Sequence, residues 1–285
     1  MVKAGLDAGM TCPNRDGKCG RGGCIYCEGS SFSFASPGSI REQLAAETKR
    51  IREKYPDALI NAYFQSGTNT YAPVEKLRRL WDEALSFPEV AALSIATRAD
   101  CLGADVLNLL EEYNGRRSLT VELGLQTVHD RTARRINRGY DYGVFLAAYE
   151  ALKSRQIRTC IHMINGLPGE TEKDMLESAR VVGALSPGGV KLHLLYVTEG
   201  TALAGMWRRG EYQPMEKEAY IDLVCRQLRY FPEETVIERM TGDGDKRLLL
   251  APDWSRDKRA VLGGIQHRLK ENNWRQGDCF PCHAE

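Results

Sequence analysis

The sequence predicts an α/β fold in which strands and helices alternate along the chain. Short apolar segments rich in Val, Ile and Leu recur, and each is followed by a helical pattern of ~10–15 residues, as in parallel β/α units. The chain has 285 residues, of which 42% are hydrophobic. This is enough for one domain with a real core, because α/β barrels reach about 250 residues as single units.

Six strand-and-helix units are expected over the first 200 residues. The predicted strands are 2–8, 59–65, 90–97, 118–126, 159–165 and 190–197. The predicted helices are 39–55, 74–87, 104–113, helical segments up to about 153, and 172–185. Ser39 is expected to cap the first helix, with Gln43 near its first turn. After Gly200 the alternation fades, and a helix over 215–229, a short strand over 236–240 and a final helix over 256–270 are predicted.

Composition and charge bear on the partners of the protein and on its compartment. The net charge of +1 predicts no strong field for nucleic acid, although it does not exclude such a partner. Nine cysteines without a signal peptide indicate a reducing cytoplasm rather than a disulfide scaffold. No apolar run approaches the ~20 residues of a membrane span.

Three cysteines near the N-terminus are the strongest functional signal. Cys24 and Cys27 form a C-x2-C pair, and a glycine-rich loop separates them from Cys12. Three thiolates can hold three irons of a [4Fe-4S] cube and leave the fourth iron open to another molecule. Such a loop needs unusual backbone torsions, and four glycines are expected to supply them: Gly17, Gly20, Gly22 and Gly23.

Two other ligand sets are possible on spacing alone. Cys19, Cys24 and Cys27 would give a C-x4-C-x2-C trio. All four cysteines could instead form a zinc knuckle, for which C-x2-C is a common half-site but C-x6-C a poor one.

The segments CPNRDG and GGC-x-x-C, together with motifs at later strand ends, resemble the radical S-adenosylmethionine (SAM) superfamily. The similarity runs over nearly the whole chain and is closest to an Elongator-like bacterial branch with C-x11-C-x2-C spacing. Because these two segments match, the resemblance favours Cys12 over Cys19. It implies an enzyme whose [4Fe-4S] cluster reductively cleaves SAM to a 5′-deoxyadenosyl radical. It also implies an electron donor such as flavodoxin or ferredoxin.

The resemblance further implies a partial (β/α)6 TIM-like barrel over 1–200 and a C-terminal α/β extension over 201–285 that closes the barrel or shapes the substrate side. In such barrels the chemistry lies at the C-terminal ends of the strands. Relatives carry a segment before the first strand, so we expect either that a cap is missing here or that the start site lies upstream.

Strand-end residues are expected to bind SAM by this resemblance. Gln65 and Ser66 would contact its amino group, Gln126 its ribose or methionyl carboxylate, and Gly166 its adenine. In Ile136-NRG-Tyr140 the residue at the SAM-contacting position is Arg138. An ordinary polar turn is the alternative for residues 65–69, and an interior ion pair for Glu122 and Arg138.

Four further residues are expected at the SAM site. Thr97 and Arg98 end the third predicted strand, and Arg98 either grips a carboxylate or phosphate or forms a surface salt bridge. Glu122 lies in an apolar strand, where a buried carboxylate requires a partner. His162 is expected near the ribose, whereas His193 is as easily a core residue.

The tail offers weaker signals. Asp243, Asp245 and Lys246 could reach a substrate. Cys279 and Cys282 form a second C-x2-C pair that could serve a cluster or zinc, but a frayed tail is the alternative. The final helix carries several basic residues that could contact RNA phosphates, although a solvated face is the alternative: Arg256, Lys258, Arg259, Arg268 and Lys270.

The resemblance suggests a modified tRNA base as substrate, at the side chain of a wobble uridine. A small metabolite or tetrapyrrole-like substrate is the alternative within the same superfamily. A non-catalytic iron–sulfur or zinc module is an alternative of a different class, and a requirement for Cys19 as fourth ligand would indicate it. The oligomeric state is not predicted.

Overall fold

The structure is a computed structural model that describes residues 1–27, 37–242 and 246–280. Its residues group into two compact units. The first comprises the described residues of Met1–Arg21, Phe32–Gly124 and Gly143–Thr159, and the second those of Gly22–Ser31, Leu125–Tyr142 and Cys160–Glu285.

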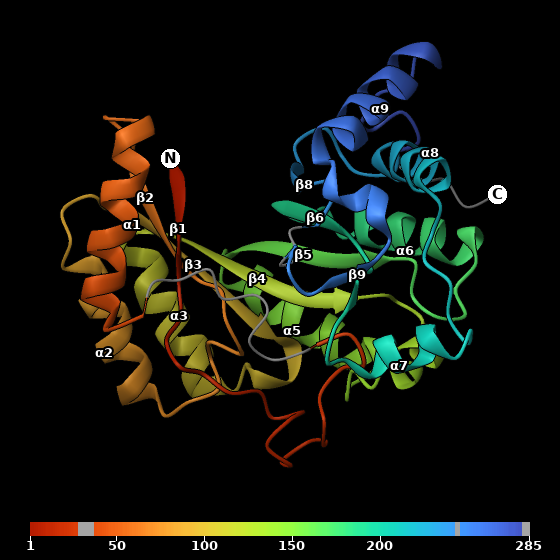
Figure 1. Ribbon diagram of the computed structural model, residues 1–285. Helices are drawn as coiled ribbons and strands as arrows, with labels where there is room; N and C mark the ends of the chain where they lie inside the picture. Colours follow the sequence, from red (N-terminus) through yellow and green to blue (C-terminus); the bar gives the residue numbers. More distant parts are fainter. Residues whose placement is uncertain (28–36, 243–245, 281–285) are drawn as a thin grey trace. The chain divides into compact units, whose positions relative to one another are not determined.

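A seven-stranded sheet has the strand order β1-β2-β3-β4-β5-β6-β8 (Figure 1). Its strands are β1 (Val2–Leu6), β2 (Ile60–Phe64), β3 (Val90–Arg98), β4 (Ser118–Gln126), β5 (Arg158–Asn165), β6 (Gly189–Leu194) and β8 (Val236–Arg239). The neighbouring pairs within each unit run parallel. This confirms the predicted α/β class with parallel strands.

In the first unit, helices α1 (Ile40–Lys54), α2 (Val74–Leu85), α3 (Ala104–Arg116) and α5 (Tyr142–Ser154) follow or connect the strands (Figure 1). The predicted cap of α1 is confirmed: the Ser39 side chain accepts a hydrogen bond from the Glu42 N–H, and the Glu42 carboxylate accepts one from the Ser39 N–H. Glu42, rather than Gln43, completes this capping box. Gln43 instead bonds the backbone of Asp7 at both its N–H and its carbonyl, so it ties α1 to the end of β1.

Part of the core of the first unit lies where α2 meets α3. Trp81 is fully buried, and its ring meets Tyr113 edge-to-face at a centroid distance of 5.2 Å. The Tyr113 hydroxyl donates to Asp82 at 2.7 Å, so the polar tip of this buried ring is satisfied.

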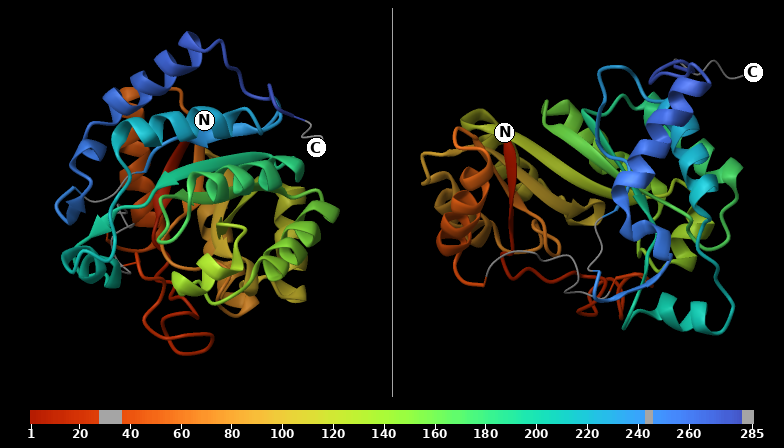
Figure 2. Two further views of the ribbon diagram at one scale, coloured as in Figure 1. Left: turned by 90° about the vertical axis from the view of Figure 1, so that its right-hand side faces the viewer. Right: turned by 45° about the horizontal axis from the view of Figure 1, so that its top comes forward.

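In the second unit, the helices are α4 (Asp130–Arg135), α6 (Glu172–Ala184), α7 (Ala202–Arg208), α8 (Lys217–Leu228) and α9 (Lys258–Glu271). Figure 2 shows α9 beside α8, and Gly264 allows this approach, because an added Cβ would lie 2.6 Å from Ile221. A reciprocal amide pair at 2.8 Å between Asn165 and Gln227, both buried, joins the end of β5 to α8.

The chain after residue 194 differs from the prediction. The predicted strand 190–197 ends at Leu194, and Val197–Thr198 form a separate strand, β7, paired antiparallel with β9 (Leu249–Ala251). Helix α7 and strand β9 were not predicted, because seven and three residues are too short for a clear periodicity. Strand β8 pairs with β6, so the tail supplies a strand to the main sheet.

The strands of the first unit present one apolar and one polar face. Parallel register places Lys3, Tyr63, Ser94, Thr120 and Glu122 on one side, since successive side chains alternate. We call these five residues the polar face of the first unit. The opposite side is apolar and buried, as in Leu6, Phe64, Ile95, Val121 and Leu123.

Candidate active site

The loop after Cys12 is held by its own backbone. The Cys12 carbonyl accepts from the N–H groups of Arg15 and Asp16 at 2.8 and 3.1 Å, and that of Pro13 accepts from Cys19. At Gly20 an added Cβ would lie 2.2 Å from the buried Asn14 Oδ1, so only glycine fits there. Gly17 has a positive φ of 96°, so the two glycines serve the loop for different reasons.

Cys24 and Cys27 lie in the second unit on one tight turn. The Cys27 N–H donates to the Cys24 carbonyl at 2.9 Å. Between them, Ile25 donates to the Ile136 carbonyl at 3.1 Å and accepts from the Leu203 N–H at 2.9 Å. This turn is therefore anchored to the segment after α4 and to α7.

The Ile136-NRG-Tyr140 segment contacts the cysteine turn directly. Asn137 donates its side-chain amide to the Gly23 carbonyl at 2.7 Å. Burial and the neighbouring Cys24 and Cys27 hold the pKa of the Tyr26 hydroxyl well above its usual range. The structure thus brings together two motifs that lie more than a hundred residues apart in the sequence.

The three cysteines are chemically suited to a cluster. All described cysteines are free thiols, and Cys12, Cys24 and Cys27 are each half-buried while Cys19 is exposed. Among the described residues, no group of three or more His, Cys, Asp or Glu is placed to hold a metal ion. Cys12 belongs to the first unit and the C-x2-C pair to the second. The ligand trio therefore stays a prediction, which the fixed turn at Cys24 and Cys27 fits.

The loop after β2 lies against the chain just before Cys12. The Thr68 N–H donates to the Thr11 carbonyl at 3.1 Å, and a Cβ at Gly67 would lie 2.2 Å from the Met10 carbonyl oxygen. Asn69 donates its amide to the carbonyls of Phe64 and Ala96, so it ties β2 to β3. Ser66 is buried, and its Oγ has no hydrogen-bond partner among the residues described.

The end of β3 satisfies its polar groups locally. Thr97 is buried, and its hydroxyl lies 2.5 Å from that of Thr70, which donates to the Cys101 carbonyl. The Arg98 guanidinium donates two hydrogen bonds, of 2.9 and 2.7 Å, to the Asp100 carboxylate. This arginine thus pairs with a carboxylate two residues away, and both side chains are at most 15% exposed.

Glu122 has the partners that its burial requires. Its carboxylate accepts from Lys3 Nζ at 2.5 Å and from the Tyr63 hydroxyl at 2.6 Å. Lys3 Nζ also lies 4.9 Å from the centroid of the Tyr63 ring. The interior ion pair named as the alternative for Glu122 is therefore present. Sequence reasoning missed Lys3 and Tyr63, although the period-two pattern of β1 and β2 places both on this face.

Arg138 holds the end of β4. It is fully buried, and its guanidinium donates to the carbonyls of Leu125, Thr127 and Tyr140 at 2.5, 2.7 and 2.9 Å. Between the first two acceptors, Gln126 has a positive φ of 66°, a conformation that is rare outside glycine and concentrated at functional sites. Arg138 therefore fixes the backbone that presents the half-buried Gln126.

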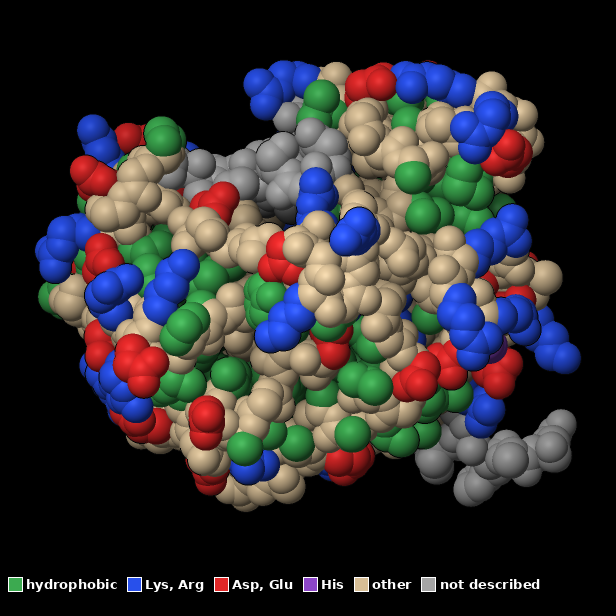
Figure 3. All heavy atoms as spheres, turned by 90° about the horizontal axis from the view of Figure 1, so that it is seen from below, with side chains coloured by type: hydrophobic (Ala, Val, Ile, Leu, Met, Phe, Trp, Pro, Cys, Tyr) green, Lys and Arg blue, Asp and Glu red, His purple; other side chains and the backbone are tan. Residues whose placement is uncertain are grey.

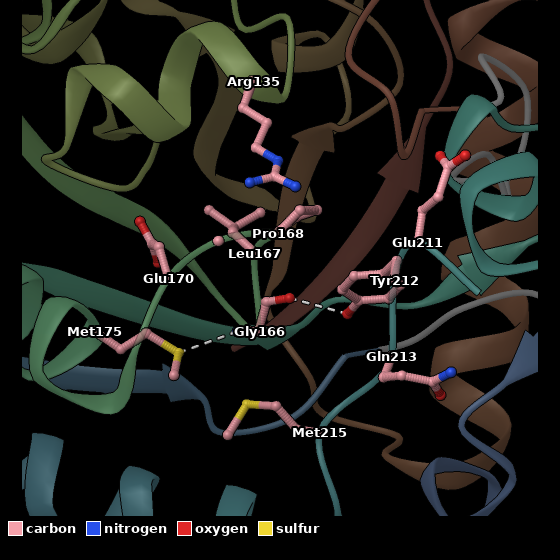
Figure 4. A pocket seen from close by; sticks show the side chains of 11 residues that line it. Arg135, Gly166, Leu167, Pro168, Glu170, Met175, Glu211, Tyr212, Gln213 and Met215 are labelled. Carbon is pink, nitrogen blue, oxygen red and sulfur yellow. Dashed lines mark hydrogen bonds between the residues drawn. The ribbon is translucent and has the colours of Figure 1, made fainter. Parts of the chain in front are cut away.

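A cavity of about 220 Å³ lies at the Gly166-LPG-Glu170 loop after β5 (Figure 4). The Tyr212 hydroxyl donates to the Gly166 carbonyl at 2.9 Å, and the Gly166 N–H donates to Met175 Sδ at 3.1 Å. Gly166 has a φ of 87° and a Cβ there would lie 3.1 Å from Met215. In Figure 4 the Tyr212 ring extends toward Gly166 from the opposite wall.

Two ionisable side chains in and just after this loop have shifted pKa values. Burial raises the pKa of Glu170, against the opposing effect of the Thr127 hydroxyl, which donates to it at 2.5 Å. Four residues on, hydrogen bonds from Thr171 and Arg131 lower the pKa of Asp174 to about 2. His162 lies on β5, half-buried, with its ring centroid 5.3 Å from that of His193 on β6.

The tail residues are placed in part. Asp243, Asp245 and Cys282 lie outside the described residues. Lys246 is exposed, and Cys279 donates its N–H to the Arg229 carbonyl. On α9, Arg268 bonds Asp222 and Glu218, so one of the predicted RNA contacts is engaged within the protein. Figure 3 shows Lys and Arg side chains interspersed with Asp and Glu over one face of the molecule.

Sequence and structure comparisons identify the family. The radical SAM superfamily model matches residues 16–182, and the radical SAM C-terminal domain model matches residues 187–271. The chain belongs to the radical SAM superfamily. It is an enzyme, and the cofactors of its family are a [4Fe-4S] cluster and SAM.

Relatives cover nearly the whole chain. It is 42% identical to the uncharacterized protein YtqA of Bacillus subtilis, over 98% of this chain and 88% of that protein. It is 25% identical to a tRNA uridine(34) acetyltransferase of Methanocaldococcus jannaschii, over 96% of this chain and 57% of that protein.

The fold has a solved counterpart. The structure of Methanocaldococcus infernus Elp3 with an N-terminal deletion superimposes with a TM-score of 0.72 and 19% identity, over 96% of this chain and 64% of that one. This likeness confirms the predicted partial TIM-like barrel fold.

No helix of the described chain is long and apolar enough to cross a membrane.

Proposed function

We propose that this radical SAM enzyme cleaves SAM reductively and acts on the side chain of the wobble uridine in tRNA. When bound, the reduced cluster supplies one electron that breaks the carbon–sulfur bond of SAM, which gives methionine and a 5′-deoxyadenosyl radical able to remove a hydrogen atom from the substrate. Enzymes of this family need an electron donor, and we propose flavodoxin or ferredoxin.

Different residues of the chain serve the cluster and SAM. We propose that Cys12, Cys24 and Cys27 ligate three irons and leave the fourth to SAM. Ser66 Oγ and the Gln126 amide are suited to polar groups of SAM, since the first is a buried hydroxyl and the second is held on a strained backbone. We propose that the site for SAM also includes Gln65, Thr97, Arg98, Glu122, Arg138, His162 and Gly166.

The contacts of these residues support different kinds of role. Gly166 lies on a cavity wall and can approach a flat ring with its backbone. Thr97, Arg98, Glu122 and Arg138 all bond other protein groups, so they act on SAM chiefly by holding the strand ends in place. This arrangement supports positioning of the cofactor by a rigid scaffold.

The observation that favours tRNA is the similarity to a tRNA uridine(34) acetyltransferase over 96% of the present chain. The matched region is nearly the whole of the present chain but only 57% of that enzyme. The free thiols of all described cysteines fit a reducing compartment, so we place the reaction in the cytoplasm.

The test uses the reconstituted protein under anaerobic conditions with SAM, a reductant and an anticodon stem-loop RNA. Formation of 5′-deoxyadenosine and a change in mass of the nucleoside at position 34 are both measured by mass spectrometry. We expect both when the uridine at position 34 carries its modified side chain, and only uncoupled 5′-deoxyadenosine with a cytidine there.

A strain that lacks the gene provides the second test. Its tRNA nucleosides should differ from those of the parent at the wobble uridine. Wild-type protein should restore the parental pattern, and the Cys27→Ala variant should not. Identical nucleosides in both strains would exclude the wobble uridine as substrate.

A further inference from the structure

Both backbone groups of Gly166, the first residue after β5, are bonded by side chains from other elements. The Gly166 carbonyl accepts from the Tyr212 hydroxyl at 2.9 Å, and its N–H donates to Met175 Sδ on α6 at 3.1 Å. Figure 4 shows these two bonds reaching Gly166 from opposite sides. Gly166 is buried and has a φ of 87°, so the chain leaves the strand conformation here. The direction of this peptide group therefore depends on two distant side chains.

Tyr212 reaches Gly166 from the segment between α7 and α8, in the C-terminal extension. It is only 6% exposed, and its ring belongs to an apolar cluster that also contains Leu167, Ile136 and Leu203. Burial raises the pKa of the Tyr212 hydroxyl, so this group keeps its proton at neutral pH and acts as a donor. The ring is thus fixed by packing while the hydroxyl is directed at the loop after β5.

The turn that carries Cys24 and Cys27 packs against the same apolar cluster. Ile25 and Tyr26, the two residues between these cysteines, are partly buried against it. The backbone bonds of Ile25 to Ile136 and Leu203, described above, join the turn to two members of the cluster. The cluster therefore contacts both the cysteine turn and the loop after β5, and Tyr212 is the member that bonds the loop.

The other end of this loop is held separately. The hydroxyl of Thr127, a buried residue at the end of β4, donates to Glu170 at 2.5 Å. Gly166 and Glu170 both line the cavity of about 220 Å³, as does Tyr212 itself. The start of this cavity wall thus depends on Tyr212 and its end on Thr127.

We propose that Tyr212 is a positioning residue for SAM. Its hydroxyl orients the peptide group between Gly166 and Leu167, and its ring keeps the loop packed with the turn that carries Cys24 and Cys27. The inference rests on the proposed placement of SAM at Gly166 and goes beyond it, because it gives a residue of the C-terminal extension a part in cofactor binding. Without the hydroxyl, the buried Gly166 carbonyl loses its donor and the peptide group is free to turn.

The test compares Tyr212→Phe with the wild type, both full-length and reconstituted under anaerobic conditions. Calorimetry should show a dissociation constant for SAM raised about tenfold. Iron content should stay at the wild-type value, because the ring is kept. In the absence of SAM, hydrogen exchange followed by mass spectrometry should be faster over residues 166–170 in the variant. Unchanged SAM affinity would overturn the proposal.

Tyr220→Phe is the matched control. Tyr220 lies on α8 in the same unit, is fully buried, and donates its hydroxyl to the Met240 carbonyl at 3.0 Å. Both variants should lower the urea midpoint of unfolding by a similar amount, since each leaves one carbonyl without its donor. Only Tyr212→Phe should weaken SAM binding. Equal weakening by Tyr220→Phe would reduce Tyr212 to a general structural role.

Tyr212→Leu separates the ring from the hydroxyl. It should weaken SAM binding and also lower the iron content, because Ile25 and Tyr26 lose part of the surface against which they pack. Wild-type iron content in this variant would remove the link between the ring and the cysteine turn.

Two fragments of SAM locate the effect along the cofactor. Tyr212→Phe should weaken binding of 5′-deoxyadenosine as much as that of SAM and leave binding of methionine unchanged. Weakening of methionine alone would contradict the placement of the nucleoside at Gly166.

The wild-type protein gives a reading that needs no variant. SAM should slow hydrogen exchange over residues 166–170 and 209–215 together, and protection of neither segment would count against the proposal. All of these measurements are made without RNA, so a failure of the wobble-uridine test leaves them intact, and the reverse.

Discussion

The strands of the two units carry different charged groups in buried positions. In the first unit, Glu122 meets Lys3 at 2.5 Å and Tyr63 at 2.6 Å, so a negative charge is compensated by its immediate neighbours. In the second unit, Lys191 stands in register between His162 and Arg239, all of them basic. Both faces belong to parallel strands and both contain ionisable groups in buried positions.

A carboxylate bonded at both oxygens by protein groups stabilises the arrangement of β1, β2 and β4 around it. Lys191 and its two neighbours in register also interact with other groups of the protein. The contacts of Glu122 therefore assign a mainly supporting role to the first face.

The cysteines should give the largest effect, because the predicted ligand set draws on both units. Cys12→Ala, Cys24→Ala and Cys27→Ala should each abolish the visible absorption of the reconstituted cluster. Cys19→Ala, at an exposed position, should retain most of it. Normal iron content in Cys12→Ala would transfer its role to Cys19.

Removal of Glu122 tests the first face. Glu122→Leu should lower the free energy of unfolding by about 3 kcal/mol, because Lys3 and Tyr63 lose a buried partner. The double variant Lys3→Met/Glu122→Leu should recover part of this loss, as measured by urea denaturation. Glu112→Gln, which breaks an ion pair with Arg78 that is 43% exposed on each side, should cost less than ~1 kcal/mol.

Equal costs for Glu122→Leu and Glu112→Gln would contradict a supporting role for the first face. A stable Glu122→Leu variant that has lost turnover would instead move Glu122 into the reaction.

Gln126 and Arg138 separate contact with SAM from support of it. Gln126→Ala should weaken SAM binding about tenfold while the cluster is retained. Arg138→Ala should weaken binding and also lower the free energy of unfolding, because two buried carbonyls and a partly buried one lose their donor. Calorimetric SAM binding and urea denaturation measure the two effects.

Gln126→Gly serves as the control for backbone strain. Glycine tolerates the positive φ, so stability should rise slightly while SAM affinity still falls. Unchanged SAM affinity in both Gln126 variants would remove this residue from the binding site.

The smallest effect concerns pH. Because burial raises the pKa of Glu170 above its ordinary value of 4.5, the folded state favours the protonated form. The stability that this gives is fully present below pH 4.5 and is lost as pH rises through the raised pKa. Glu170→Gln, which stays neutral, should therefore gain stability relative to wild type between acidic and neutral pH, measured by thermal unfolding. Glu177→Gln, at an exposed position on α6, controls for the loss of a charge.

The alternation of strands and helices could be predicted because its signals are local. Strand β4 has the predicted bounds, and α2 begins at the predicted residue. The hydrophobic pattern of an apolar strand or an amphipathic helix can be recognised within about ten residues. Helix α7 and strand β9 could not be found this way, because they are stabilised by contacts with distant segments, such as the Leu203 bond to Ile25.

The candidate active site could be predicted only where a sequence motif marks its residues. The C-x2-C pair and the INRG segment were visible in the sequence, but their contact through Asn137 and Gly23 was not. The partners of Glu122 and the alignment of Lys191 with Arg239 depend on strand register. Register is a property of the assembled sheet and leaves no local signal in any one strand.

The turn between Cys24 and Cys27 has a consequence for how the enzyme matures. Both backbone groups of Ile25 are bonded to other elements, so we expect these protein contacts to order the turn without help from iron. The conformational entropy of this segment would then be lost during folding, and iron binding would have less chain left to order. Slow hydrogen exchange at the Ile25 amide in the iron-free protein would demonstrate this preorganisation, whereas fast exchange would show that the turn forms only with the metal.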